Sequence, residues 1–520
     1  MGVGPPRSDA IPWARQVGYD PPGPGERGES NGRESNRVRL LMIGLSALVA
    51  VAGSGWPAVS AARAAAGDFE RLLSLSLEEL GQLEVTSASR TSDALWEVPA
   101  SVYVIHGEEI AVAGAHTLVE ALQLAPNLHV ARTDARGFAV SARGLKTTLS
   151  NKLLVLVDGR PIYTPLFAGV LWDQQDTLVQ DIERIEVISG PGAAAWGSNA
   201  VNGVINIITR PAAATIGGMA GAFVGGNRRG AVARQGWALG DDAAMRVYAK
   251  RSSFDHSETR AGSSVGDGWE QSQAGFRSDF NHGDDALRLQ GDVFRAESDP
   301  RPAGTGAVEV DGFNMLAHWT RLLDASSNLQ VQAFVDVVDR VDPLVLLDRM
   351  RTLDIEAQYT HARDAHTLVW GGGYRQARDE SAAGLFARLL PAERTLEWIN
   401  LFVEDKIALS DRLAVHLGLR AESNSYTGVE WLPSARLTWQ LEDGAVLWAS
   451  GSRAVRAPAR FDRDFFFPAS APINPIYPQS MMDWWGRFGE ANARAYEVYG
   501  YPFLARMPDG PSGPAETLPK

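Results

Sequence analysis

The sequence predicts a membrane β-barrel that follows a smaller domain of helices and strands, and two observations support this fold class. Between residues 153 and 210, three short apolar strands are separated by glycine-bearing turns. From Thr215 onward, segments of about 10 residues alternate apolar and polar side chains, as the strands of a membrane barrel do. Such strands satisfy their backbone groups in lipid only when they pair with one another.

The composition narrows the class of protein. The 520 residues are 45% hydrophobic and 21% charged, which suffices for a sizeable core and for more than one domain. The formal net charge of -13 argues against a nucleic-acid partner. The 15 Trp and 52 Gly suit a barrel with aromatic girdles and tight turns. Because Cys is absent, disulfides, zinc-thiolate sites and thiol nucleophiles are excluded.

The amino end carries a targeting signal. Residues 1–36 are rich in Gly, Pro, Ser and charge, and are predicted to be a disordered extension. Residues 37–66 have the layout of a secretory signal peptide, with Arg37 and Arg39 before an apolar stretch and cleavage near Ala62 or Ala66. An uncleaved anchor is the alternative, although the apolar run is short for a membrane span. A signal peptide that begins so late suggests an overextended start, which amino-terminal sequencing would test.

The first domain is predicted at residues 98–211. Residues 153–157 form an apolar run stopped by the turn dipeptide Asp158–Gly159, residues 182–188 alternate, and residues 204–208 carry β-branched side chains around Asn206. Before these three strands, we expect strands at 101–105, 128–131 and 138–142 and short helices at 107–112 and 117–124.

The order VDGRPIY and then DIERIEVISGPGAAAWGSNAVNGVINIITR resembles the plug domain of TonB-dependent outer-membrane receptors. Upstream, ASVYVIHGEEIAVAGAHTLVEALQLA and the Ser141–Gly144 segment resemble earlier motifs of the same domain. The resemblance spans residues 75–211 with several motifs in order, which is more specific than any lone motif. Trp196 stands where the family commonly has Tyr, and Ser189 where it often has Arg. Both departures are compatible with the fold.

The resemblance implies a TonB box in the linker region, residues 67–97. The short β-prone segment Leu83, Glu84, Val85, Thr86 and Ser87 resembles this box, which adds as a strand to the periplasmic protein TonB through main-chain hydrogen bonds. An ordinary linker is the alternative. About 20 residues separate the predicted cleavage site from the box, far fewer than a typical domain, so we expect no extra signalling domain.

The resemblance also places YTPLFAGVLW towards the outside-facing apices of the plug. Tyr163, Phe167 and Trp172 are therefore the candidate ligand-binding residues. For each one singly, packing against the barrel wall is the favoured alternative, because aromatic side chains mostly serve to fill contacts.

The sequence gives little support for catalysis, and we predict no enzyme, no catalytic residue, no metal site and no cofactor. The glycine-rich turn at residues 190–197 lacks the Lys-Ser/Thr of a phosphate loop. Glu183 and Glu186 lie three apart on a strand and so point to opposite faces, which argues against an acid–base pair. Ion pairing to Arg184 or to arginines of the barrel wall is the simpler role for them.

The barrel is predicted at residues 212–460. Its clearest strands are 243–254, 286–295, 328–337, 351–360, 395–409 and 413–422. Short turns such as 240–242 and 410–411 fit the periplasmic side, and longer polar segments such as 257–268 and 379–393 fit the outside. The segment Ser452 to Pro458, SRAVRAP, resembles a barrel motif of the same family.

The predicted barrel is incomplete. We count about 13 candidate strands, whereas plugged transporters of this type use about 22. Residues 461–520 form an atypical segment that alternates poorly and ends GPSGPAETLPK. Either the gene product is truncated or shifted in frame, or a loop-rich end hides strands, and we favour truncation. We expect poor insertion of this chain alone; heat-modifiable, protease-resistant outer-membrane material would contradict that expectation.

The function implied by the resemblance is energy-coupled import across the Gram-negative outer membrane. The expected partners are TonB, outer-membrane lipid and a scarce small-molecule chelate, either a ferric siderophore in iron uptake or a cobalamin-like ligand. The alternative is a non-transporting or degenerate binding or signalling receptor with a truncated barrel.

Overall fold

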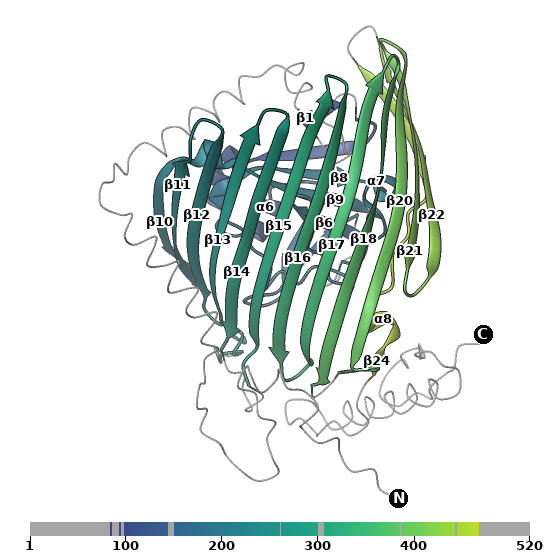
Figure 1. Ribbon diagram of the computed structural model, residues 1–520. Helices are drawn as coiled ribbons and strands as arrows, with labels where there is room; N and C mark the ends of the chain where they lie inside the picture. The colour runs from purple at the N-terminus through teal and green to yellow at the C-terminus, as the bar shows by residue number, and fades with distance from the viewer. Residues whose placement is uncertain are drawn as a thin grey trace, which may run out of the picture. The chain divides into compact units, whose positions relative to one another are not determined.

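The computed structural model describes residues 84–85, 93–94, 98–143, 150–260, 262–299, 306–384, 387–441 and 445–466. All of them belong to one compact unit, Trp56–Lys520. The predicted extension and signal peptide, most of the predicted TonB box and most of the atypical segment lie outside the described residues. Within them, a curved antiparallel sheet, here called the wall, holds the smaller mixed domain, here called the plug, on its concave side (Figure 1).

The plug contains the predicted strands and helices. Its elements are β3 (Ser101–His106), α5 (Gly107–Ala113), α6 (Leu118–Leu122), β4 (Leu128–Arg132), β5 (Phe138–Ala142), β6 (Leu153–Val157), β7 (Arg160–Pro161), η3 (Val179–Asp181), β8 (Ile182–Ser189), α7 (Ala193–Trp196), β9 (Gly203–Thr209) and η4 (Ala212–Thr215). Thr117, which the sequence placed in the second helix, is instead its N-cap, and its side chain accepts a hydrogen bond from the Glu120 N–H. Before the plug, β1 (Glu84–Val85) and β2 (Asp93–Ala94) pair with each other in antiparallel orientation.

A five-stranded sheet organises the plug in the order β3-β8-β9-β6-β7, with β6 and β9 parallel. The reversal between β6 and β7 is a two-residue turn at Asp158 and Gly159, whose φ angles are 50° and 88°. A two-residue turn of type I′ requires positive φ angles at both central residues, and the dipeptide Asp-Gly adopts them with little strain. One face of the sheet packs on α5 and α6 around Ile105, Leu122, Ile185 and Ile205, all without exposure or nearly so.

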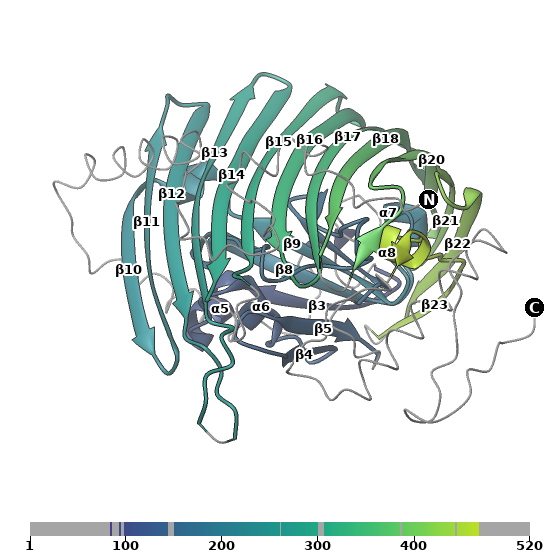
Figure 2. The same cartoon turned by 90° about the horizontal axis from the view of Figure 1, so that it is seen from below.

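The wall has 13 strands in sequence order, which confirms the predicted number. They are β10 (Gly217–Gly225), β11 (Arg228–Ala238), β12 (Ala243–Phe254), β13 (Trp269–His282), β14 (Asp285–Ser298), β15 (Glu309–Asp324), β16 (Ser327–Asp342), β17 (Leu346–Arg363), β18 (His366–Ala383), β20 (Glu393–Ser410), β21 (Leu413–Asn424), β22 (Gly428–Gln440) and β23 (Val446–Ser452). Seen from below, the wall curves around the plug (Figure 2). Among the described residues, β10 and β23 each pair with one neighbour only, so the sheet is not closed.

The two faces of the wall differ in polarity. On β17, Leu353 and Ile355 point outward and are 53% and 49% exposed, while Asp354 between them points inward and is 8% exposed. Exposed Trp370 and Trp439 lie on outward faces near the ends of strands, where an aromatic girdle is expected. Among the described residues, the structure contains no helix with both the length and the apolar character needed to cross a membrane.

One predicted loop begins too early in the sequence. Residues 379–383 belong to β18 rather than to a polar connection, and only residues 384–392 connect β18 to β20. The sequence indicated a loop because this stretch is charged. In the structure the side chain of Asp379 is fully buried and forms an ion pair with Arg460. The predicted connection at 257–268 and the predicted turn at 240–242 are confirmed.

After β23 the chain turns back into the wall. This return segment, residues 453–466, contains α8 (Arg460–Arg463) and β24 (Phe465–Phe466), and β24 pairs with β19 (Arg388–Leu389). Its backbone contacts the plug, because the N–H groups of Arg460 and Phe461 donate to the carbonyls of Pro165 and Leu166 at 3.0 Å. The guanidinium of Arg460 has no exposure and also binds Asp464 at 2.9 Å.

Candidate functional site

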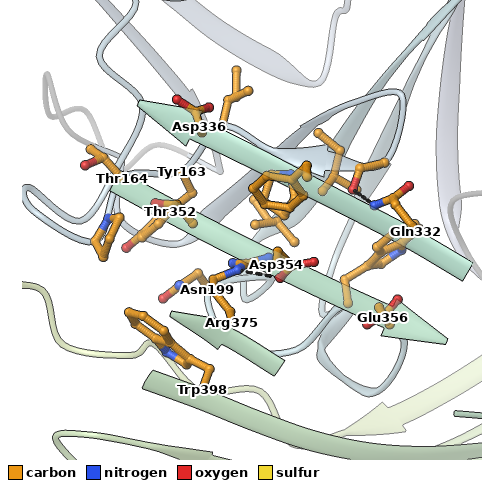
Figure 3. A pocket seen from close by; sticks show the side chains of 18 of the residues that line it. Tyr163, Thr164, Asn199, Gln332, Asp336, Thr352, Asp354, Glu356, Arg375 and Trp398 are labelled. Carbon is orange, nitrogen blue, oxygen red and sulfur yellow. Dashed lines mark hydrogen bonds and ion pairs between the residues drawn. The ribbon is translucent and has the colours of Figure 1, made fainter. Parts of the chain in front are cut away.

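A cavity of about 730 Å³ lies between the plug and the inner face of the wall (Figure 3). Its volume is in the range of small-molecule sites, about 300–1,000 Å³. The wall side consists mainly of every second residue of two neighbouring strands: Asn328, Gln330, Gln332, Phe334, Asp336, Val338 and Arg340 of β16, and Asp348, Met350, Thr352, Asp354, Glu356, Gln358 and Thr360 of β17. Since side chains alternate between faces, the cavity follows the inner surface along most of both strands.

The plug side of the cavity is formed by the turn after β6 and the chain that follows it. Tyr163 and Thr164 face the β16–β17 surface, and Asn199 joins them from the loop after α7 (Figure 3). Asp158 and Gly159 of the turn also line the cavity. The carbonyl of Gly159 accepts a hydrogen bond from the Gln332 amide at 3.1 Å, so the turn is seated directly on the wall.

The return segment completes the lining with residues 457–459. It is tied to the plug by Asn199, whose N–H donates to the Val455 carbonyl at 2.8 Å and whose side-chain oxygen accepts from the Ala457 N–H at 2.9 Å. Plug, wall and return segment therefore each supply one side of the same cavity.

Ion pairs attach the plug to the wall outside the cavity as well. Asp181 of η3 binds Arg234 and also Arg246, the latter at 2.9 Å, and its side chain is 2% exposed. Asp176 binds Lys250 at 2.5 Å. The plug supplies the carboxylate and the wall supplies the cation in each of these contacts. The pair of Arg160 with Asp336, which lies at the cavity, has the opposite polarity.

Two further buried carboxylates of the plug, Asp158 and Asp173, are held in the charged form. Burial by itself raises the pKa of Asp158, but Arg288, Arg277 and the Thr209 N–H, which donates at 2.9 Å, more than offset it and leave that pKa below its usual value. Burial acts the same way on Asp173, and its bonds to Arg340 at 2.8 Å and Arg136 at 3.0 Å lower its pKa. Both groups are thus anions that depend on their arginines.

The three aromatic candidates occupy different environments. Tyr163 is half-buried and lines the cavity, and burial raises the pKa of its hydroxyl. Phe167 packs on Phe461 of the return segment, with ring centroids 4.3 Å apart. Trp172 is 8% exposed within the apolar core of the plug. A role in ligand binding remains a prediction for all three, and only Tyr163 is positioned on the cavity.

Of the predicted TonB box, Glu84 and Val85 form β1, while Leu83, Thr86 and Ser87 lie outside the described residues. The backbone of β1 pairs with Asp93 and Ala94. The predicted ion pairing of Glu183 and of Glu186 with Arg184 is confirmed, since the two carboxylates lie 2.6 and 2.8 Å from its guanidinium.

The wall residues of the cavity were missed from the sequence. The signal existed in the polar positions of strands 328–337 and 351–360, which share one parity and therefore one face. The alternation does not say which stretch of the inner face the plug leaves uncovered. Among the described residues, no cluster of three His, Asp or Glu side chains is arranged to hold a metal ion.

Two family models match the chain. The TonB-dependent receptor plug domain matches residues 94–204, and the TonB-dependent receptor-like β-barrel matches residues 215–504. Among curated proteins, the vitamin B12 transporter BtuB of Photobacterium profundum is 30% identical over 223 residues, covering 39% of this chain and 36% of that protein. An iron-regulated outer membrane virulence protein of Vibrio cholerae is 36% identical over 135 residues, covering 24% and 20%.

Solved structures agree on the fold. The ferric enterobactin receptor PfeA of Pseudomonas aeruginosa superposes with a TM-score of 0.59 at 18% identity, covering 70% of this chain and 64% of that one. The siderophore receptor PirA of the same organism gives 0.55 at 20%, covering 69% and 66%. The chain thus matches about a third or less of these curated relatives and just under two thirds of these structures. By its plug, its wall and both family models, the chain belongs to the TonB-dependent receptors of the Gram-negative outer membrane.

Proposed function

We propose that this protein imports a scarce ligand, a ferric siderophore or a cobalamin-like molecule, by TonB-coupled rearrangement of the plug, and that it makes or breaks no covalent bond. The observation that carries the proposal is the shared cavity. Because the plug forms one side of it, a ligand bound there contacts the element that has to move. The names of the relatives, which include a vitamin B12 transporter and a ferric enterobactin receptor, support these two ligand classes.

The order of strands supports a pulling mechanism. The segment from Leu83 to Ser87 precedes β3 in the chain, and among the described strands β3 is an edge strand of the plug sheet that pairs with β8 alone. An edge strand separates by breaking one ladder of hydrogen bonds, whereas a central strand would break two. A force applied at the TonB box by strand addition would therefore first separate the short β1–β2 pair and would then reach β3 before any other strand of the plug sheet.

Removal of β3 would open the floor of the cavity. Val102 and Val104 of β3 pack in the same apolar cluster as Leu154 and Leu156, and both leucines line the cavity. Stripping β3 from the sheet would remove apolar contacts beneath the bound ligand. The site for the ligand and the site of pulling would thus be linked through one small cluster.

The direct test is uptake. Cells that lack their own receptors would express the full chain, and uptake of labelled cyanocobalamin, ferrichrome and ferric enterobactin would be compared with and without TonB. In cells whose outer membrane contains the chain in heat-modifiable, protease-resistant form, we expect uptake of at least one probe that disappears without TonB. Uptake that is equal in both strains would refute the coupling, and binding without uptake would favour the non-transporting receptor.

A disulfide across β3 and β8 tests the mechanism. Ser101 and Ser189 are directly opposite partners, and opposite positions of an antiparallel pair suit disulfide geometry. The chain has no other Cys. Oxidised S101C/S189C should bind ligand but import none, and reduction should restore import. The two single variants are the controls, and undiminished import by the oxidised protein would contradict the mechanism.

A further inference from the structure

The charges of the cavity limit the ligands it can accept. Its lining contains five arginines and six carboxylates, namely Arg184, Arg288, Arg340, Arg375, Arg420, Asp158, Asp336, Asp348, Asp354, Glu356 and Glu422. A site for a multiply charged anion needs cations in excess of their own partners. The described lining has more carboxylates than arginines.

Each of the five arginines is already committed to carboxylates. Arg375 binds Asp354 at 2.8 Å (Figure 3), and Arg340 binds Asp173 at 2.8 Å. Arg184 binds Glu183 and Glu186, Arg288 lies 3.9 Å from Asp158, and Arg420 lies 3.6 Å from Glu422 and 3.7 Å from Glu356. An anionic ligand would have to compete with these carboxylates, so their charge works against it.

The other polar side chains of the lining are mostly carboxamides: Gln174, Gln175, Asn199, Asn206, Asn328, Gln330, Gln332, Gln358 and Asn400. On the wall, Gln330 is paired in register with Gln358, and Gln332 with Glu356. A carboxamide both donates and accepts hydrogen bonds, so such a surface matches amide and hydroxyl groups of a ligand. Trp398, Phe334 and Tyr163 add apolar faces to the same cavity.

From this lining we infer that the cavity selects an uncharged ligand with amide-like or hydroxyl groups on its periphery and discriminates against chelates that carry several negative charges. The inference rests on the proposed function in taking the cavity as the ligand site. The inference restricts the possible ligands by their net charge and not by the metal they contain. A neutral iron chelate and a neutral corrinoid are both consistent with it.

The test compares ligands of different charge. Cyanocobalamin and ferrichrome are uncharged overall, whereas ferric enterobactin is a tris-catecholate with three negative charges. Binding of each to the detergent-solubilised full chain would be measured by equilibrium dialysis at low and high salt. At low salt we expect both neutral probes to bind about tenfold tighter or more than ferric enterobactin. High salt should narrow this gap, because it screens the repulsion.

A matched pair of variants locates the effect. D354N removes one lining carboxylate and frees Arg375, so ferric enterobactin should bind about three- to tenfold tighter while the neutral probes change by less than about twofold. D339N is the control, because Asp339 pairs with Arg349 at 2.5 Å on the opposite face of the wall and does not line the cavity. It should change none of the three affinities.

Ferric enterobactin binding as tightly as the neutral probes, or failure of both neutral probes to bind, would overturn the inference. The salt series on the unmodified chain needs no variant to fold. If ferric enterobactin binds best and its uptake requires TonB, the import proposal stands and the charge inference is wrong. If the neutral probes bind in the expected order but no TonB-dependent uptake occurs, only the import proposal is wrong.

Discussion

Inside the plug, side chains such as Ile105, Ile185 and Ile205 pack in an apolar core without exposure, whereas the surface that the plug presents to the wall is held by ion pairs such as Asp181 with Arg246. Separating the first kind of contact exposes apolar surface, at about 25 cal/mol for each Å². Separating the second kind returns charges to water, which offsets much of the lost attraction. The contacts between plug and wall should therefore open more readily than the apolar core of the plug, as long as no force acts directly on the edge strand β3.

The largest effect should come from Asp181→Asn. The variant leaves the buried Arg246 and the partly buried Arg234 without their shared carboxylate, and breaking a buried ion pair on one side costs about 3–5 kcal/mol. Hydrogen exchange should show faster opening at the plug–wall contacts around η3, with the amides of β9 still protected. Equal loss of protection in β9 would show that the two kinds of contact are not separable.

Ile205→Ala should produce the complementary pattern. It removes fully buried apolar volume from the core, which costs about 2–5 kcal/mol. The same exchange measurement should show faster opening of β8 and β9, while the wall amides beside η3 change little. If the amides of the wall beside η3 lose as much protection as those of β8 and β9, the core of the plug and its contacts with the wall do not open independently.

Acid should loosen the interface before the core. The folded pKa of Asp158 and of Asp173 is lower than in the unfolded chain, so the stabilisation is fully present above the unfolded pKa, about 3.9, and is lost as the pH falls through the lower folded values. Protease protection of the plug should hold from pH 7 down to about pH 4 and decline below it. A loss of protection near neutral pH would exclude these two carboxylates as the cause.

The smallest effect should come from an exposed ion pair. Arg251 and Glu270 contact each other at 2.7 Å, but their side chains are 67% and 52% exposed. Glu270→Ala should change the free energy of unfolding by less than about 1 kcal/mol. A loss as large as that of Asp181→Asn would mean that burial does not decide the strength of these pairs.

The sequence predicts the plug better than the wall, for a physical reason. Plug strands end at special turn chemistry, such as Asp158–Gly159, which leaves a local signal. The wall strand β17 begins at Leu346, five residues before the predicted start at residue 351. Its first outward positions include Arg349 and Arg351, which pair with Asp339 and Glu380, so alternation of apolar and polar residues is absent there.

The cavity and the return segment were not predictable in the same way. Which wall residues line the cavity depends on how the plug is seated, and that is fixed by contacts distant in sequence, such as Gly159 with Gln332. Arg460 lies in a charged stretch without apolar–polar periodicity, which in a sequence is typical of an exposed segment. In the structure its side chain is fully buried against Asp379 and Asp464. No local sequence pattern predicts that its partner is Asp379, 81 residues away in the chain.

The length of the central strands sets the height at which a ligand first meets the protein. β17 and β18 each have 18 residues; at about 3.3 Å per residue and a tilt of roughly 45°, they rise about 40 Å, whereas the hydrocarbon layer is about 30 Å thick. The outward ion pair of Arg349 and Asp339 lies at the end of these strands with the longer connections, so the surplus is on that side. Arg340 and Asp348, which line the cavity, lie at this end of the strands, so these dimensions place this part of the lining beyond the hydrocarbon layer.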